Sequence, residues 1–177
     1  MEIVIILGLI FFNGILSMSE IAMVSTRKSR LETAAKKGSK TAKTALRLAN
    51  EPDRFLSTIQ IGITLIGILT GLYSGEALAG DLARWLETIG IPQAHSLTLA
   101  KGIIVILVTY LTLILGELVP KHLGMNAPEK IARLIARPME VLSKIASPFV
   151  WLLSASTQAV IRLTGLHTST ENKVTEE

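Results

Sequence analysis

The chain of 177 residues contains no cysteine, and only 5% of its residues are aromatic. The absence of cysteine excludes a disulfide framework and any metal site built on thiolates. Charged residues are also scarce, at 18%, whereas hydrophobic residues make up 49%, so the chain is too apolar to remain disordered. Because the apolar residues come in long uncharged runs, the sequence is not typical of an ordinary soluble domain.

Four stretches contain no charged residue: 3–19, 55–75, 102–116 and 145–161. A helix that crosses the hydrocarbon layer needs roughly 17–25 mostly apolar residues. The first three stretches reach this length once flanking residues with long, flexible side chains, such as Lys101, are included. The fourth contains a proline and several hydroxyl groups, so it either lies at the interface or on the spans, or forms a fourth crossing. We therefore predict an all-α integral membrane fold with three transmembrane helices.

The positions of lysine and arginine predict the orientation of these helices. Nine of the 18 basic residues lie in 27–54, and five more lie in 121–144. An excess of Lys and Arg marks the cytoplasmic side of the cell membrane. We therefore expect 27–54 and everything after Pro120 on the cytoplasmic side, and the N-terminus and 80–97 on the outer side. Nucleic-acid binding requires basic residues gathered on one face of a soluble fold, and this sequence does not predict such a face. The net charge of +4 therefore does not indicate nucleic-acid binding.

The connections between the spans predict amphipathic juxtamembrane helices. Residues 27–50 carry Ala and Leu at helical spacing and are expected to form a helix or a helix pair broken near Gly38. Another amphipathic helix is expected to begin near Pro128 and to be broken by Pro138 and Pro148. The polar residues at the end predict two parts, a membrane domain over 1–165 and a linker or tail over 166–177.

Three carboxylates, those of Glu20, Glu76 and Glu117, fall within or beside the predicted spans. Burying an ionised carboxylate in hydrocarbon costs on the order of 2.5–3.5 kcal/mol, so each is a candidate functional group. Glu76 lies at the outer end of its span and is expected at the interface. The helical rise places Ser19 and Glu117 about 24 and 28 Å from the outer ends of their spans.

Residues of the second span share this depth, because Gly62 and Thr64 lie about 10–14 Å from its inner end. All three spans thus bring small or oxygen-bearing residues to the inner half of the membrane, including the hydroxyl groups of Ser17 and Ser19 beside Glu20. Oxygen ligands of this kind are those that a hard cation such as Mg²⁺ prefers. The sequence therefore predicts an intramembrane cation site, with the Glu117 carboxylate balanced by a metal rather than by a basic neighbour.

Pro120 has two interpretations. It has no N–H and clashes with the carbonyl of Gly116, which it would free to point at a cation beside Glu117. Alternatively, Pro120 simply ends the helix at the membrane edge. Lys121 follows directly as a charge on the inner side.

Three glycines of the second span, Gly67, Gly71 and Gly75, recur at intervals of four. Such spacing lets helices approach closely, so we assign these glycines to packing between spans or between subunits, with a role in a pore as the alternative. The three histidines lie apart from other metal-ligating residues and give no zinc signature. None shares the depth of Ser17 and Ser19, so an enzyme with a serine nucleophile is not predicted.

Three motifs in order, SMSEIAMVSTRKSRL, EPDRFLSTIQIGITLIGIL and LGELVPKHLG, closely resemble the transmembrane domain of the CNNM/CorC (HlyC/CorC, cyclin M-like) family. The resemblance covers about residues 3–163. It implies a homodimer with three spans and a belt of juxtamembrane helices, acting as a magnesium exporter that uses a sodium gradient. It also implies cytosolic nucleotide-binding CBS domains as partners, which these 177 residues do not include.

Carried over by motif, the resemblance points to Ser19, Ser17, Gly116 and Glu117 as ligands, with Lys121 nearby. Many members have asparagines where this chain has Ile63 and Gly67, so Thr64 or a carbonyl near Gly62 would have to substitute. The rival hypothesis is a membrane anchor and dimerisation module that positions cytosolic domains without moving ions.

Overall fold

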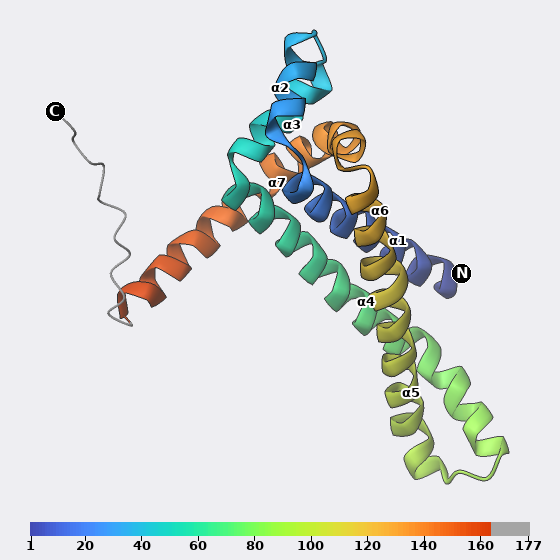
Figure 1. Ribbon diagram of the computed structural model, residues 1–177. Helices are drawn as coiled ribbons and strands as arrows, with labels where there is room; N and C mark the ends of the chain where they lie inside the picture. The colour runs from blue at the N-terminus through green and yellow to red at the C-terminus, as the bar shows by residue number, and fades with distance from the viewer. Residues whose placement is uncertain (164–177) are drawn as a thin grey trace.

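The computed structural model describes residues 1–163, which form a bundle of helices without a strand in this part of the chain (Figure 1). The predicted tail over 166–177 lies outside the described residues. The helices, in chain order, are α1 (Glu2–Ser25), α2 (Lys28–Lys36), α3 (Lys40–Asn50), α4 (Pro52–Thr88), α5 (Gln93–Leu113), the π-helical turn η1 (Ile114–Leu118), α6 (Val119–Asn126) and α7 (Pro128–Leu163).

Three helical segments are long and apolar enough to cross a membrane: Glu2–Ser25, Pro52–Thr88 and Gln93–Asn126. The predicted all-α membrane fold with three spans is confirmed. The third span is continuous through α5, η1 and α6. Helix α4 runs well past the uncharged stretch, so the connection expected over 80–97 is helical except for residues 89–92.

Helix α7 is not among these candidate spans within residues 1–163, so nothing supports a fourth crossing by 145–161. Its first half packs on α3, α1 and α4. Figure 1 shows its second half leaving the bundle at a large angle to α1 and α4. A helix lying along the membrane surface would have this orientation relative to the spans.

The predicted helix pair over 27–50 is confirmed as α2 and α3, and Gly38 joins them at a φ of +90°, which favours glycine. Ser39 caps α3 by accepting a hydrogen bond from the Ala42 N–H (3.3 Å). The pair is held against α7 by a buried cluster of Leu31, Ala45 and Ala136.

The expectation that Pro138 and Pro148 break the last helix is wrong, because α7 runs through both. An internal proline removes one backbone hydrogen bond and costs about 3 kcal/mol. Here the apolar face of α7 lies buried against the bundle on both sides of Pro138, which offsets that cost. The buried side chains on this face are Ala132, Ile135, Ala136, Met139, Ser143, Ala146 and Val150.

The glycines Gly67, Gly71 and Gly75, predicted to pack between spans or between subunits, make no close contact with another span within residues 1–163. A Cβ built on any of the three would meet no atom of residues 1–163 within 4 Å. Close helix contact occurs instead at Gly62, where a Cβ would lie 2.7 Å from Leu16 Cδ1, and along the contact of α1 with η1 and α6. Contact with a second subunit stays a prediction for the three glycines of α4.

Glu140 on α7 joins the juxtamembrane helices to one another, because its carboxylate pairs with Arg47 of α3 and lies 3.3 Å from Lys144 Nζ. The hydrogen bond from Lys144 lowers the pKa of Glu140 below its ordinary 4.5. Desolvation opposes this shift in part, and the positive charge of Arg47 adds to it. A carboxylate with a lowered folded-state pKa stabilises the fold above its unfolded-state pKa and loses that contribution as the pH falls through its folded value.

We therefore predict that acidification below pH 4.5 weakens the α3–α7 contact in the wild type. In Glu140→Gln this pH-dependent loss should be absent, because the contact is already weakened at neutral pH. Hydrogen exchange of the α3 backbone amides as a function of pH, corrected for the intrinsic pH dependence of exchange, measures the difference. Glu32→Gln, at an exposed position of α2, serves as the control and should behave as the wild type.

Candidate intramembrane cation site

The third span changes its helical geometry where it meets α1. Pro120 cannot donate a backbone hydrogen bond to Gly116, and the chain responds with the π-helical turn η1, in which the Val119 N–H bonds to the Ile114 carbonyl. The helix then continues as α6 to Asn126, so the interpretation of Pro120 as a simple helix stop is wrong. Single π-helical turns within helices are frequently found at functional sites.

The freed Gly116 carbonyl accepts a hydrogen bond from the Asn13 side-chain amide of α1 (3.0 Å). The close approach that this requires depends on two glycines. A Cβ on Gly116 would lie 3.2 Å from Asn13 Nδ2 and from the Ile10 carbonyl, and a Cβ on Gly14 would lie 2.9 Å from Pro120 Cγ. Glycine on both helices therefore places the amide of α1 directly on the π-helical turn.

Two buried oxygen atoms at this contact have no partner. Among residues 1–163, Asn13 Oδ1 and Ser17 Oγ neither donate nor accept a hydrogen bond, and their residues are only 4% and 0% exposed. They lie four residues apart on α1 and therefore on one face of it. A buried polar group without a partner costs about 1–3 kcal/mol, so this pair is expected to bind a water molecule or a ligand.

Sequence reasoning selected Ser17 but missed Asn13. The available signal was the spacing of an amide one helical turn before Ser17 in an uncharged run. Ser19 is also fully buried, but its hydroxyl donates to the Ile15 carbonyl of its own helix (2.6 Å).

The two carboxylates predicted at this depth, those of Glu117 and Glu20, both form ion pairs with one lysine, Lys121. Lys121 Nζ is 2.6 Å from Glu117 Oε1 and 3.8 Å from Glu20 Oε2, so an ammonium group links η1 and α1. All three side chains are partly buried, with 29–38% of each exposed. The sequence analysis expected a metal to balance the charge of Glu117, but in the structure the Lys121 ammonium pairs with this carboxylate.

The predicted ligands of the second span lie on a different surface. Gly62 packs against Leu16 of α1, and Ile63 packs against the main apolar cluster. Thr64 is exposed and lines a cavity of ≈ 770 Å³ together with Glu20. Gly67 borders a separate cavity of ≈ 210 Å³ against α5.

The described chain therefore brings together an oxygen-based set of groups rather than a cluster of metal-binding side chains. Within residues 1–163 no group of three or more His, Cys, Asp or Glu side chains is placed to hold a metal ion. The set consists of an amide oxygen, a hydroxyl and a backbone carbonyl at the α1–η1 contact, with two carboxylates nearby on Lys121. Neutral oxygens combined with few carboxylates suit a hard or hydrogen-bonding cation.

Comparison with known proteins identifies the family. Residues 4–177 match the family described as the Cyclin M transmembrane N-terminal domain. The chain belongs to this family. The CNNM resemblance of the three motifs is thereby confirmed, and the chain is a multi-pass membrane protein whose spans lie in a lipid bilayer.

Relatives of this CNNM domain occur in several bacteria. The chain is 46% identical over 177 residues to UPF0053 protein sll0260 of Synechocystis sp., covering 100% of this chain and 40% of that protein. It is 31% identical over 171 residues to UPF0053 protein YhdT of Bacillus subtilis, covering 97% and 37%. It is 29% identical over 176 residues to the Polyamine export protein of Escherichia coli, covering 99% and 39%. The chain thus spans 37–40% of the length of these relatives.

Proposed function

We propose that this CNNM domain transports a cation across the membrane, with Mg²⁺ exported as the cargo. The observation that carries the proposal is the pair of buried, unpartnered oxygens of Asn13 and Ser17 beside the Gly116 carbonyl. Mg²⁺ prefers oxygen ligands at about 2.0–2.1 Å in octahedral geometry and usually keeps several waters. The Glu117 carboxylate supplies the negative charge that such a site needs, and Ser19 is a further candidate ligand, whereas Thr64 lies on a different surface.

Lys121 has a defined part in this mechanism. Its ammonium pairs with Glu117 and approaches Glu20 while no cargo is bound, which compensates one of the two negative charges at membrane depth. An incoming cation that binds Glu117 displaces the ammonium, which retains Glu20 as its partner. Lys121 is therefore a tethered competitor that keeps cargo affinity low enough for release.

A linear polyamine is a second candidate cargo. The observation in its favour is again Lys121, whose primary ammonium already lies between two carboxylates as one end of a polyamine would. The side chains of Ile63 and Gly67 supply no oxygen for a dehydrated metal ion, which also favours the organic cation. The relative named Polyamine export protein is consistent with this cargo for at least one member of the family.

We further propose that two copies of the chain assemble through the exposed face of α4 that carries Gly67, Gly71 and Gly75. In the full-length protein, the cytosolic ends of α3 and α7 would face CBS domains. The N-terminus would lie outside the cytoplasmic membrane and the α2–α3 pair inside it.

Flux into proteoliposomes tests the proposed transport. The full-length protein is reconstituted, and uptake of Mg²⁺ and of putrescine is followed in separate arms, with and without a sodium gradient. Ser17→Ala removes an unpartnered oxygen and is expected to lower the flux of the true cargo about tenfold, the loss of roughly 1.4 kcal/mol of binding. Ser25→Ala, at an exposed position of the same helix, is the matched control and should retain full flux.

The outcomes separate the hypotheses. Flux of Mg²⁺ alone, or of putrescine alone, that depends on Ser17 identifies the cargo. No flux of either cation above that of protein-free liposomes, from protein that is folded and correctly inserted, contradicts transport and leaves the membrane-anchor hypothesis.

A further inference from the structure

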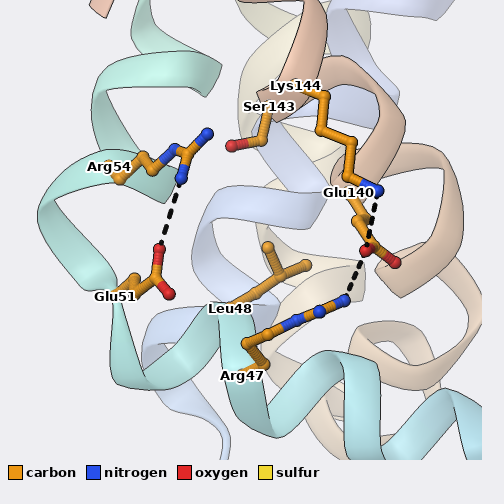
Figure 2. Close-up of a pocket in the computed structure, with 7 residues that line it drawn as sticks. All are labelled: Arg47, Leu48, Glu51, Arg54, Glu140, Ser143 and Lys144. Carbon is orange, nitrogen blue, oxygen red and sulfur yellow. Dashed lines mark hydrogen bonds and ion pairs between the residues drawn. The ribbon is translucent and has the colours of Figure 1, made fainter. Parts of the chain in front are cut away.

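Three cavities follow one another along the contact of α4 with α7. The first, of ≈ 150 Å³, is lined by residues of α3, α7 and the start of α4, including Arg54 (Figure 2). The second, of ≈ 380 Å³, shares Arg54 with the first and also borders Ser57 and Trp151. The third, of ≈ 770 Å³, shares Ser57 with the second. Because neighbouring cavities share a lining residue, they lie side by side along α4 and α7, and we refer to the row of three as the groove.

The first cavity, at the inner end of this groove, is polar and carries cations. Figure 2 shows Arg47 and Lys144 both directed at Glu140, whose carboxylate is therefore already shared by two cations. Arg54 is less fully paired, because its guanidinium lies 3.7 Å from Glu51 and donates to Ser147 Oγ at 3.2 Å. Its side chain is 45% exposed and is the cation that borders both polar cavities.

Hydroxyl groups surround Arg54 in the second cavity. Ser57, Ser147 and Ser154 line it together with one carboxylate, that of Asp53. A guanidinium with adjacent hydroxyl donors is suited to a phosphate group, because arginine binds phosphate oxygens with two parallel hydrogen bonds. Asp53 forms no ion pair with any of residues 1–163, so it is free to accept from a hydroxyl or ammonium of the same ligand.

The lining becomes more apolar with distance from Arg54. The third cavity lies beside residues of α4 that extend about 21 Å along the helix beyond Arg54, a distance close to the length of an acyl chain. Gln60, Thr64, Thr157 and Glu20 line it, but its remaining lining beyond Ser57 is apolar: Leu56, Ile61, Leu65, Ile68 and Leu153. One end of the groove thus fits a phosphate and the other end fits hydrocarbon.

We infer that this groove is a specific binding site for a glycerophospholipid of the inner leaflet, with its phosphate on Arg54 and its acyl chains between α4 and the second half of α7. The position supports this ligand over a soluble one. Arg54 lies at the inner end of a membrane span, and Trp151 is 71% exposed beside it, as expected for an aromatic side chain at the level of the headgroups.

A peptide segment or a second copy of the chain fits the groove less well. Neither would place a group with the charge of a phosphate at Arg54 and an extended apolar chain beside Leu65 and Ile68 in the same orientation. The bound lipid would fill the space between α4 and α7 and so fix the angle of α7. The inference does not depend on which cation is transported.

Native mass spectrometry of the detergent-purified, full-length protein tests this site with phosphatidylglycerol as the probe. Arg54→Gln is expected to weaken the apparent affinity about tenfold, the usual effect of losing a charge-assisted hydrogen bond. Arg84→Gln is the matched control, because Arg84 also pairs three residues back on α4, with Asp81, but at the outer end of the helix. Ser154→Leu keeps every charge, reduces the space at an exposed position and is also expected to weaken binding.

Two further ligands separate the contributions of the phosphate and the chains. Diacylglycerol with the same chains, and glycerol phosphate without chains, should each fail to displace phosphatidylglycerol at equal concentration. The proposal is overturned if Arg54→Gln and Ser154→Leu both bind as the wild type does, or if diacylglycerol competes equally. Displacement by glycerol phosphate alone would mean a soluble phosphate site and would also overturn the proposal. Disulfide cross-linking between copies through cysteines placed at Trp151 and Leu153 would mean that a second copy occupies the groove, and would overturn it as well.

Discussion

Exchange of Glu117 for glutamine is expected to abolish both cation-dependent thermal stabilisation and flux. The substitution keeps the size of the side chain and one oxygen but removes the charge. The remaining groups at the α1–η1 contact, Asn13, Ser17 and the Gly116 carbonyl, are neutral, and the other carboxylate, that of Glu20, stays paired with Lys121. The charge of a bound dication would therefore be poorly compensated. The loss corresponds to about 2–3 kcal/mol, or on the order of 100-fold in affinity.

Unfolding temperature measured against Mg²⁺ or putrescine concentration gives this affinity. Glu76→Gln, at the outer part of α4, is a matched control because it removes one carboxylate of the same kind from an exposed position. A Glu117→Gln variant that still shows the wild-type midpoint would contradict the assignment of Glu117 as the charged ligand.

The tethered-cation mechanism makes the opposite prediction for Lys121→Met. Removing the ammonium leaves Glu117 and Glu20 without a counter-charge, so cargo should bind more tightly and leave more slowly. Flux should therefore fall while the binding midpoint shifts to lower concentration. Lys101→Met, at the other end of the third span, should change neither quantity. A Lys121→Met protein that binds more weakly than the wild type would mean that Lys121 only holds the helices together.

The membrane fold was predictable because hydrocarbon excludes charge. The uncharged runs at 3–19, 55–75 and 102–116 each lie within one of the three observed spans. The helix pair joined at Gly38 was predictable for a similarly local reason. A glycine between two amphipathic stretches can adopt the left-handed conformation that ends one helix, and Gly38 does so.

The failures occurred where tertiary packing outweighs local preference. Pro138 and Pro148 are poor helix residues, but the sequence alone does not reveal that α7 has a buried face long enough to carry them. The three evenly spaced glycines of α4 have the pattern of a packing face, yet the close contacts of the described chain use Gly14, Gly62, Gly116 and Gly124. Regular spacing indicates a smooth face, and which helix covers that face is decided elsewhere in the chain.

The candidate site was predicted in part. An irregular turn at Gly116 and Pro120 was one of two interpretations that the sequence left open, and the structure has this one, because the loss of the proline N–H acts locally. Asn13 was missed because its importance depends on its lying opposite Gly116, 103 residues away in sequence. Lys121 was placed near the site, but the i,i+4 spacing that joins it to Glu117 was not weighed as an ion pair.

The contact of α6 with α1 at Gly124 is expected to tolerate an added methyl group less well than the other close glycine contacts between helices. A Cβ at this position of α6 would lie 2.8 Å from the Met18 carbonyl, and Ile21 would be closer still. Because the obstructing atoms include backbone of α1, they cannot rotate away, and the third span would have to move from α1. Gly124→Ala should therefore destabilise the protein by about 1–3 kcal/mol despite the better helix propensity of alanine.

Gly71→Ala is the matched comparison, since it adds the same methyl group to a membrane helix where nothing in residues 1–163 lies within 4 Å. The propensity gain alone predicts a neutral or slightly stabilising change in the single chain. Thermal unfolding in detergent, followed by the fluorescence of Trp85 and Trp151, measures both variants. If Gly124→Ala unfolded at the wild-type temperature, the close contact of α1 with α6 would be wrong. If Gly71→Ala instead dissociated a dimer on size-exclusion chromatography, its glycine face would be the contact between copies, because no atom of residues 1–163 lies within 4 Å of the added methyl group.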